Sequence, residues 1–352
     1  MSEAESPQPG APTRRTLLAI VAAALLLPPG VGRAEPDKPR VAEPPVRIEV
    51  RARPILSFEP RDPSRHRFGQ LEFRGGVELT SSYKEFGGVS AIRVRPDGAH
   101  FLALTDQGRW LRGRLTYDGM RPTGIADAEM APILGADGRP LAARRWYDTE
   151  SIAEDDGVVY VGIERVHQIV RLDYAKHGLL ARGQPIPVPP GFKQLPSNGS
   201  IEALEFVPKG LPLAGTLIAI SERGYDEAGN LKAFLIGGPS PGTFAVKRSD
   251  DFDISDCALL LPGELLILER RYSLWRGVAL RIRRIPLASI KPGALVDGPV
   301  VVLADMGYEI DNMEGLSVHR TAAGDTVLTL ISDDNFSAIQ RTILLQFTLV
   351  EE

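Results

Sequence analysis

Pairs of glutamate and arginine end three apolar stretches of the sequence, at Glu164-Arg165, Glu222-Arg223 and Glu269-Arg270. Two further apolar stretches end in acids, at Asp106 and Asp333. Carboxylates gathered at one place raise one another's pKa unless cations neutralise them. Two kinds of cation are open here: the neighbouring arginines, or a hard metal ion such as calcium, which takes roughly six to eight oxygen ligands.

Polar side chains, most of them acids or amides, also stand one strand earlier, at the start of the hairpin that each apolar stretch completes. The starting groups are Ser90, Asp148 with Glu150, Asn198 with Glu202, Asp253 with Asp256, and Asp311 with Asn312 and Glu314. In an antiparallel hairpin the start of the first strand and the end of the second lie at the same edge of the sheet. We therefore expect four acidic pairs at such edges, namely Glu150 with Glu164, Glu202 with Glu222, Asp256 with Glu269, and Glu314 with Asp333.

The elements that would position these acids are short strands. From residue 47 onward, runs rich in Val, Ile, Leu and aromatic residues are separated by Asp-Gly, Pro-Gly and Gly-Gly turn signals, which predicts an all-β chain. The acidic ends fall at residues 106, 164, 222, 269 and 333, with a mean spacing near 57. A fixed period of this size is typical of a β-propeller, whose blades are small antiparallel sheets. A β-sandwich with coincidental hairpins is the alternative.

Six blades are predicted from this spacing. Dividing residues 47–352 by the mean spacing gives between five and six blades, and the sixth would be closed by strands from both ends of the domain. In that blade "RTILLQFTLV" would pair beside strands near "RFGQLEFRGGVEL". Radial repetition brings equivalent sheet edges together around a central channel, so the carboxylates would converge at one mouth.

The first 34 residues have the pattern of an export signal. Paired Arg14 and Arg15 precede an apolar run, Leu17–Leu27, whose 11 residues fall short of the roughly 20 that a spanning helix needs. The pattern around the arginines is similar to a twin-arginine signal, with an ordinary secretory leader as the alternative. Residues 35–46 form a proline-rich linker. We therefore expect a periplasmic or secreted protein, exported by the twin-arginine machinery and without a stable membrane span after cleavage.

The composition of the chain limits its partners and its chemistry. A net charge of -4 offers no broad attraction to nucleic acid, so we expect no nucleic-acid partner. Cys257 is the only cysteine, so the exported protein must be stable without an internal disulfide. The sequence contains no Gly-x-Ser-x-Gly elbow and no His-x-x-x-His pair, which disfavours a serine hydrolase of the α/β type and a zinc site.

The repeated motifs resemble those of the bacterial phytase-like family, also labelled "esterase-like activity of phytase". The resemblance rests on "GGVSAI…LALTDQG", "DTESIA…YVGIER", "SIEAL…ISERG", "DISDCALL…LILERR" and "DNMEGLSV…LISDDNF". It extends from about Gly87 to the C-terminus. It implies an exported propeller domain over residues 47–352 that hydrolyses a phosphate or carboxylate ester.

Together with this resemblance, the acids predict metal-assisted hydrolysis of a small-molecule ester at an acidic channel mouth. The predicted calcium ligands are Glu150, Glu202, Asp256, Glu314 and Asp333. Arg165, Arg223 or Arg270 would stabilise the developing negative charge, and Glu164 or Glu269 would act as general base. Two alternatives are a calcium-dependent lactonase and a non-catalytic propeller that binds a ligand or a protein in the periplasm.

Overall fold

The computed structural model describes residues 43–273, 275 and 277–350 of the chain. The predicted signal peptide, residues 1–34, lies outside these residues, as does most of the predicted linker at 35–46. Within the described residues, no helix is both long enough and apolar enough to span a membrane.

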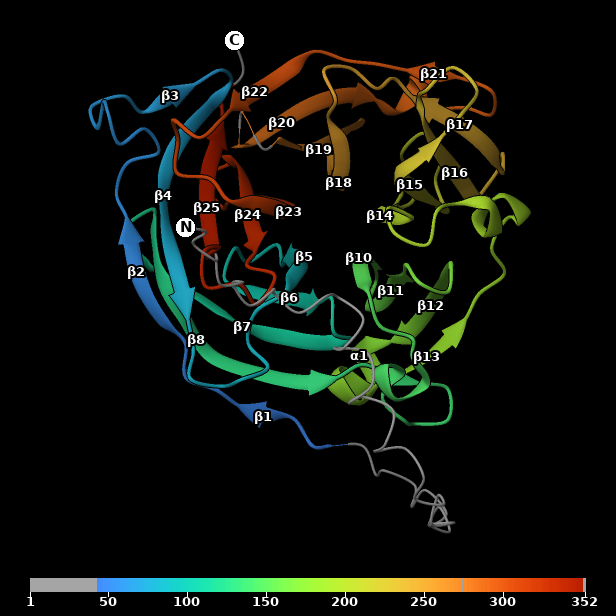
Figure 1. Cartoon of the computed structure of the whole chain (residues 1–352), viewed down its shortest axis with the longest axis horizontal. Helices are drawn as coiled ribbons and strands as arrows, with labels where there is room; N and C mark the ends of the chain where they lie inside the picture. The colour runs from blue at the N-terminus through green and yellow to red at the C-terminus, as the bar shows by residue number, and fades with distance from the viewer. Residues whose placement is uncertain (1–42, 274, 276, 351–352) are drawn as a thin grey trace, which may run out of the picture. The chain divides into compact units, whose positions relative to one another are not determined.

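Five sheets are arranged around a common centre, as Figure 1 shows. We number them blades 1 to 5 in the chain order of their innermost strands, which are β5 (Val89–Val94), β10 (Thr149–Asp155), β14 (Ile201–Phe206), β18 (Asp253–Leu260) and β23 (Asn312–Arg320). Each of these strands contacts the next in this order, and β23 contacts β5, so the ring of inner strands is closed. The fold is an all-β propeller, as the sequence predicts.

The first three blades continue outward through three consecutive antiparallel strands, and each is completed by a strand from elsewhere in the chain. Blade 1 continues with β6 (His100–Thr105), β7 (Arg109–Asp118), β8 (Arg121–Pro132) and β1 (Val46–Arg47). Blade 2 continues with β11 (Val158–Ile163), β12 (Gln168–Asp173), β13 (Arg182–Pro185) and β9 (Leu134–Gly135). Blade 3 continues with β15 (Thr216–Tyr225), β16 (Leu231–Gly237), β17 (Gly242–Val246) and β21 (Leu295–Val296). In blades 2 and 3 the outermost strand pairs in parallel.

The last two blades differ in how they end. Blade 4 continues with β19 (Glu264–Ser273), β20 (Gly277–Pro286) and β22 (Val300–Ala304). Blade 5 continues with β24 (Thr326–Asp333), β25 (Thr342–Leu349), β4 (Leu71–Thr80) and β2 (Arg51–Ile55), with β3 (Arg67–Phe68) paired to β4. The described helices are short: α1 (Tyr174–His177) and the 3-10 segments η1 (Leu141–Arg144), η2 (Gly178–Leu180), η3 (Pro190–Gln194) and η4 (Leu287–Ser289).

The hydrophobic core consists of five clusters, and each fills the space between two neighbouring blades. Strand β6 shows how one strand serves two of them. Leu102 and Leu104 pack toward blade 2, whereas Phe101 and Ala103 pack toward blade 5. Successive side chains of a strand point to opposite faces, so a strand buried on both faces needs an unbroken apolar run. This explains the continuous apolar stretches in the sequence.

The prediction of six blades is wrong, although the predicted pairing of the two chain ends is confirmed. β25 runs antiparallel to β4, with Thr342 opposite Leu79 and Leu349 opposite Leu71. β25 also pairs with β24, so the strands from both ends complete blade 5 and form no sheet of their own. The segment before β5 adds strands to an existing blade, and therefore dividing the chain length by the repeat spacing overestimates the number of blades.

Candidate functional site

A β-bulge occurs near the start of every inner strand. In each blade, the pairing between the inner strand and its neighbour skips one residue. The skipped residues, which we call the bulge positions, are Ser90, Glu150, Glu202, Ser255 and Glu314. A bulge places one extra residue outside the ladder and redirects its side chain. The three bulge glutamates all line one cavity.

The second strand of each blade supplies another set of equivalent residues. The residue before each bulge pairs with a residue of the second strand, and we call the next residue along the chain the end position. The end positions are Asp106, Glu164, Glu222, Arg270 and Asp333. All of them line the same cavity as the bulge glutamates. Blades 1 and 4 have a serine at the bulge position, and blade 4 alone has an arginine at the end position.

We call this hollow, where the inner strands begin, the acidic cavity. Its volume is about 170 Å³. Its lining residues are Asp106, Asp148, Glu150, Glu164, Asn198, Glu202, Glu222, Arg223, Arg270, Glu314, Asp333 and Asn335. Eight of these side chains are carboxylates and two are guanidinium groups. Carboxylates from blades 1, 2, 3 and 5 therefore concentrate negative charge in a space too small for a large substrate.

Glu164 lies at the junction of two compact groups of carboxylates. One group consists of Asp148, Glu150 and Glu164, and the other of Glu164, Glu202 and Glu222. Within each group, one oxygen of every carboxylate lies within 4.8 Å of the others. Backbone amides hold Glu164 in place, because the N–H of Ser200 donates to its Oε1 at 2.6 Å and the N–H of Gly199 donates to the same oxygen. These clusters of acidic residues have the donor atoms and the spacing to hold a metal ion.

Burial and neighbouring carboxylates raise the pKa values of several acids in this cavity. Burial raises the pKa of Glu150 well above its ordinary value, and neighbouring glutamates add to the shift. It raises the pKa of Asp106 to about 7 and that of Asp333 to about 6. The pKa of Glu314 rises to about 8 through burial, although Arg270 opposes the shift. Either protons or a cation with oxygen ligands would neutralise such a site.

Arg270 neutralises part of the negative charge of the acidic cavity. It donates to the side-chain oxygen of Asn312 at 2.7 Å and to Glu222 at 3.0 Å, and it lies 3.4 Å from Glu314. Arg223 pairs with Glu222 at 3.1 Å and with Asp253 at 3.3 Å. The arginines therefore neutralise one side of the acidic cavity. Among the described residues, none of the salt bridges reaches Glu150, Glu164 or Glu202 on the other side.

Asp256, a predicted calcium ligand, does not line the acidic cavity. It lies one residue past the bulge position and forms a bidentate pair with Arg93, at 2.9 and 3.2 Å. Arg93 also donates to the backbone carbonyls of Ile92, Leu204, Cys257 and Leu316, and thus joins the inner strands of four blades. The Arg93–Asp256 pair therefore acts as a structural crosslink across the channel.

The sequence distinguishes Asp256 from the bulge glutamates, because the other blades have small residues at its position. The positions equivalent to Asp256 hold small residues in the other blades, namely Ala91, Ser151, Ala203 and Gly315. Inner strands approach closely there, because a Cβ added to Gly315 would lie 3.1 Å from the nitrogen of Ile92. Aligning the repeats by these small residues would have placed Ser255, rather than Asp256, beside the bulge glutamates.

Two of the predicted catalytic residues also lie outside the acidic cavity. Glu269 is fully buried one residue before the end position of blade 4, where it accepts hydrogen bonds from Arg281 and Arg283. Arg165 is half-exposed and pairs with Asp148 at 2.8 Å without lining the cavity. The predicted residues that the structure does bring together are Glu150, Glu164, Glu202, Arg223, Arg270, Glu314 and Asp333.

Sequence reasoning named Asp106 and Glu222 as strand ends but gave neither a role at the site. Asp106 carries a further feature, since its Oδ1 is buried without a hydrogen-bond partner in the described part of the chain. Its place in the repeat, at the end position of blade 1, was the signal that could have identified it.

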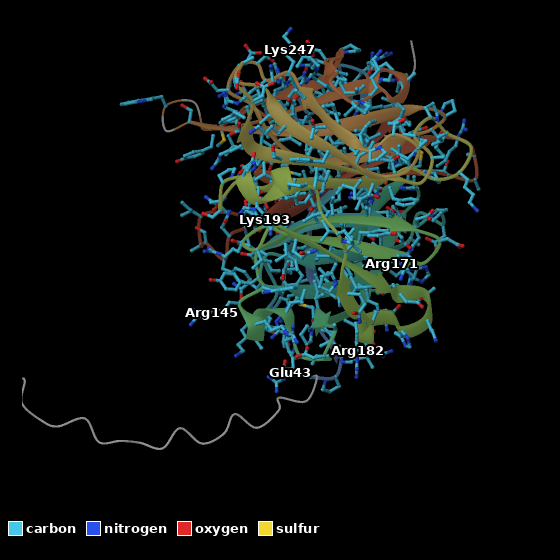
Figure 2. The ribbon with its side chains drawn as sticks, turned by 90° about the vertical axis from the view of Figure 1, so that its right-hand side faces the viewer. Glu43, Arg145, Arg171, Arg182, Lys193 and Lys247 are labelled. Atoms are coloured by element: carbon cyan, nitrogen blue, oxygen red, sulfur yellow. The ribbon has the colours of Figure 1, made fainter. Side chains whose placement is uncertain are left out.

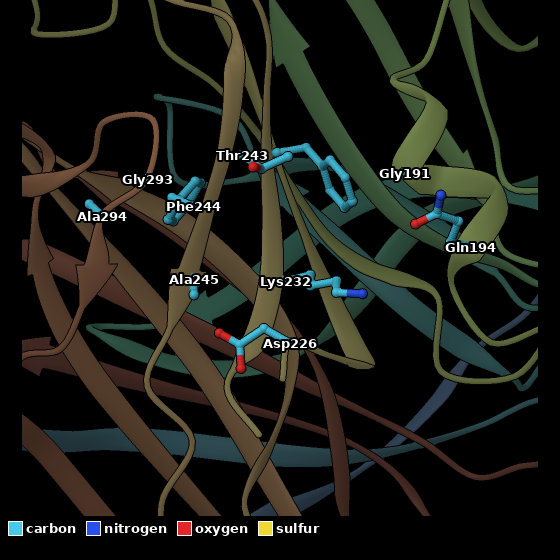
Figure 3. Close-up of a pocket in the computed structure, with 10 residues that line it drawn as sticks. Gly191, Gln194, Asp226, Lys232, Thr243, Phe244, Ala245, Gly293 and Ala294 are labelled. Atoms are coloured by element: carbon cyan, nitrogen blue, oxygen red, sulfur yellow. The ribbon is translucent and has the colours of Figure 1, made fainter. Parts of the chain in front are cut away.

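A separate cavity of about 320 Å³ lies on the outer part of blade 3, and Figure 3 shows its lining. Gln194 of η3 lies on one side of it and Thr243 and Ala245 of β17 on the other. It contains one lysine and one aspartate, Lys232 and Asp226, and shares no lining residue with the acidic cavity. Its residues form neither a carboxylate cluster nor a nucleophile–base pair.

The outer surface of the propeller has exposed charged side chains of both signs. Figure 2 shows basic side chains on the outer surface, among them Arg145, Arg171, Arg182, Lys193 and Lys247, and all five are exposed. The acids of the site are buried at the centre of the propeller instead. The whole chain has a net charge of only -4, yet eight carboxylates and two guanidinium groups line the interior site.

Comparison with known proteins gives a family match and several distant structural similarities. A family model described as "Phytase-like: Esterase-like activity of phytase" matches residues 84–336. No curated protein sequence matches the chain. Among solved structures, glutaminyl cyclase of Myxococcus xanthus is similar at 9% identity and a TM-score of 0.38, over 75% of this chain and 92% of that chain. A PQQ-bound aldose sugar dehydrogenase of Streptomyces coelicolor is similar at 13% identity and a TM-score of 0.39, over 87% and 99%.

The family match covers most of the chain and includes every bulge position and every end position. The chain therefore belongs to the phytase-like family.

Proposed function

We propose that the acidic cavity binds calcium and that the protein hydrolyses phosphate or carboxylate esters at this site. The observation that carries the proposal is the pair of carboxylate groups joined at Glu164, in which no arginine of the described residues forms a salt bridge with Glu150 or Glu202. All the available donors are oxygens, which suits a hard cation. A bound cation would polarise the phosphoryl or carbonyl oxygen of the ester.

The residues of the cavity supply the other roles that hydrolysis requires. Asp106 has a pKa of about 7 and a buried oxygen without a partner, so it is suited to accept a proton from the attacking water. Arg270 and Arg223 line the cavity and would stabilise the negative charge that develops on the ester. The bond to the leaving oxygen then breaks, and the alcohol takes its proton from solvent.

The test is thermal unfolding of the full-length chain in chelator and then in calcium, together with hydrolysis of p-nitrophenyl phosphate and p-nitrophenyl acetate. We expect calcium to raise the melting temperature and to be required for turnover, and Glu164→Gln to abolish both effects. Glu227→Gln changes an exposed acid in a turn and serves as the matched control. Unchanged melting in calcium would refute the proposed cation site.

A second candidate function is a non-catalytic propeller that binds a ligand in the periplasm. The contacts of Arg270 with Glu222, Asn312 and Glu314 favour it, because they balance part of the acidic cavity without a metal ion. In that case calcium would stabilise the protein, or leave it unchanged, without any product being formed. Turnover by the wild type that is lost in Asp106→Asn supports the hydrolase. Absence of turnover in the wild type, with calcium or another ligand still bound, supports the non-catalytic propeller.

Export to the periplasm or the medium is part of the same proposal. Its support is the pattern of residues 1–34, which lies outside the described structure. Cell fractionation of the full-length chain and of a variant with Arg14 and Arg15 changed to lysine tests it. Retention of the double variant in the cytoplasm is the expected result.

A further inference from the structure

A larger hollow adjoins the acidic cavity, and we call it the adjoining groove. The two share Arg223, Arg270, Glu314 and Asn335 in their linings. The groove has a volume of about 790 Å³, against about 170 Å³ for the acidic cavity. Ligand sites in proteins usually measure roughly 300 to 1,000 Å³. The acidic cavity therefore has room for a cation and a few waters, whereas the body of a substrate must lie in the groove.

The charge of the groove is opposite to that of the cavity. Arg223, Arg270, Arg271 and Arg341 line the groove, against two carboxylates. Arg341 is balanced by Glu309 at 2.9 Å and Asp311 at 3.5 Å. Arg271 is different, because no salt bridge joins it to any carboxylate in the described residues, and its Nε is buried without a hydrogen-bond partner.

The position of Arg271 is nevertheless fixed. Its guanidinium lies 4.9 Å from the ring centre of Phe252, and one of its nitrogens donates to the carbonyl of Asp250 at 3.2 Å. A guanidinium that is held in place and lacks a counter-charge is a receptor for a phosphate or a carboxylate. The groove thus offers an anion site close to a cavity that would hold a cation.

Apolar side chains form another part of the groove lining, and two of them are exposed. Val278 and Ile310 lie in its lining, and Met306 and Ile339 border it with exposed fractions of 63% and 91%. Met306 is seated against Gly277, where an added Cβ would come within 2.5 Å of its Cγ. Large apolar side chains exposed together beside a binding site indicate a ligand that covers them.

We propose that the substrate is a phosphate monoester with an apolar substituent, an inference that rests on the proposed hydrolase function. The phosphate binds between Arg271 and the cation site, and the apolar substituent lies over Met306 and Ile339. Water adds to phosphorus and the bond from phosphorus to the alkyl oxygen breaks. The products are inorganic phosphate and the alcohol, whose oxygen takes its proton from solvent.

The test compares n-butyl phosphate with n-octyl phosphate. We expect calorimetric titration of the calcium-loaded full-length chain to show octyl phosphate binding at least about tenfold more tightly, since each buried methylene contributes roughly 0.8 kcal/mol. Arg271→Gln should weaken both ligands about tenfold, and Ile339→Ser should weaken octyl phosphate severalfold more than butyl phosphate. The matched controls are Arg182→Gln and Leu303→Ser, which change exposed residues outside the groove. Equal affinity for the two ligands, or no effect of Ile339→Ser, overturns the inference.

Release of inorganic phosphate from both ligands separates this inference from the proposed function. Chain-length-dependent binding without phosphate release would sustain the ligand class and refute the hydrolase. Equal turnover of both esters with equal affinity would sustain the hydrolase and refute the apolar substituent. If Ile339→Ser changes only the mass measured by light scattering, the apolar side chains form a contact between copies of the chain and the inference fails.

Discussion

The acidic cavity and blade 4 bury carboxylates in opposite ways. In blade 4, Glu269 is fully buried and accepts four hydrogen bonds of 2.6 to 3.0 Å from Arg281 and Arg283. Glu150 and Glu202 are almost as deeply buried, yet they have other carboxylates as neighbours and no arginine partner among the described residues. The first arrangement is complete within the chain, whereas the second requires a proton or an added cation. Burial of an acid thus indicates function here only where its counter-charge is missing.

The largest loss of stability is expected from a change at Glu269, which Arg281 and Arg283 neutralise. Glu269→Gln leaves Arg281 and Arg283 buried without a full counter-charge, and breaking such a pair typically costs about 3 to 5 kcal/mol. We expect a loss of this size in the free energy of unfolding, measured by urea denaturation. Glu264→Gln, in the same strand but half-buried, is the control and should cost about 1 kcal/mol or less. A loss below that of the control would show that Glu269 is not a structural acid.

A second effect on stability is expected from binding of calcium to the acidic cavity. A cation at about 100 times its dissociation constant stabilises the folded state by about 2.7 kcal/mol. Glu202→Gln should have opposite effects in the two conditions, because it removes repulsion in chelator but removes a ligand in calcium. We therefore expect the variant to be more stable than the wild type in chelator and less stable in calcium, by thermal unfolding. Destabilisation in both conditions would mean that Glu202 is as structural as Glu269.

The pH dependence of stability should follow from the raised pKa values. Asp333, Asp106 and Glu314 have folded-state pKa values of about 6, 7 and 8, above the ordinary values near 4 that apply in the unfolded chain. The folded state then binds more protons, so stability without a cation is greatest below about pH 4 and falls as the pH rises through 8. One pKa unit corresponds to about 1.4 kcal/mol, and each of the three groups shifts by more than one unit, so we expect a fall of several kcal/mol.

Melting temperatures from pH 4 to pH 9 in chelator test this dependence. Calcium should flatten the fall, because it competes with protons for the same oxygens. Glu314→Gln should remove part of the fall in chelator. A profile in chelator that rises over this range would contradict the pKa values given above.

The smallest effect is expected at the edge of the site. Arg165 is half-exposed and pairs with Asp148, and solvent-exposed pairs contribute about 1 kcal/mol or less. Arg165→Gln should therefore change the free energy of unfolding by less than about 1 kcal/mol, and turnover by less than about threefold. A loss of turnover comparable to that of Arg270→Gln would return Arg165 to the catalytic role that the sequence suggested.

The repeat of acids was visible in the sequence because identical blades place equivalent residues at equivalent points. This regularity led to the propeller and to seven residues of the acidic cavity. The frame of blade 4 was not visible, because its acids lie one residue away from the equivalent acids of the other blades: Asp256 follows the bulge position and Glu269 precedes the end position. Asp256 and Glu269 were misplaced by this single residue, and Arg270 was not recognised as the end position of blade 4.

The Arg93–Asp256 crosslink could not have been predicted. Arg93 lies in β5 and Asp256 in β18, and the carbonyls that accept from Arg93 come from four blades. No pattern within one short stretch of sequence can therefore predict the crosslink. The adjoining groove escaped prediction for a related reason. Arg271, Met306 and Ile339 come from three distant segments, and only the packing of blades 4 and 5 brings them together.

The pairing of β4 with β25 has a consequence for how the chain folds. It joins segments from opposite ends of the described sequence, and contacts of such separation form slowly, because a long loop must close before any hydrogen bond is gained. During synthesis, blade 5 cannot be completed until β25 has left the ribosome. Blade 5, which supplies Glu314 and Asp333 to the acidic cavity, is therefore expected to be the last blade to be completed.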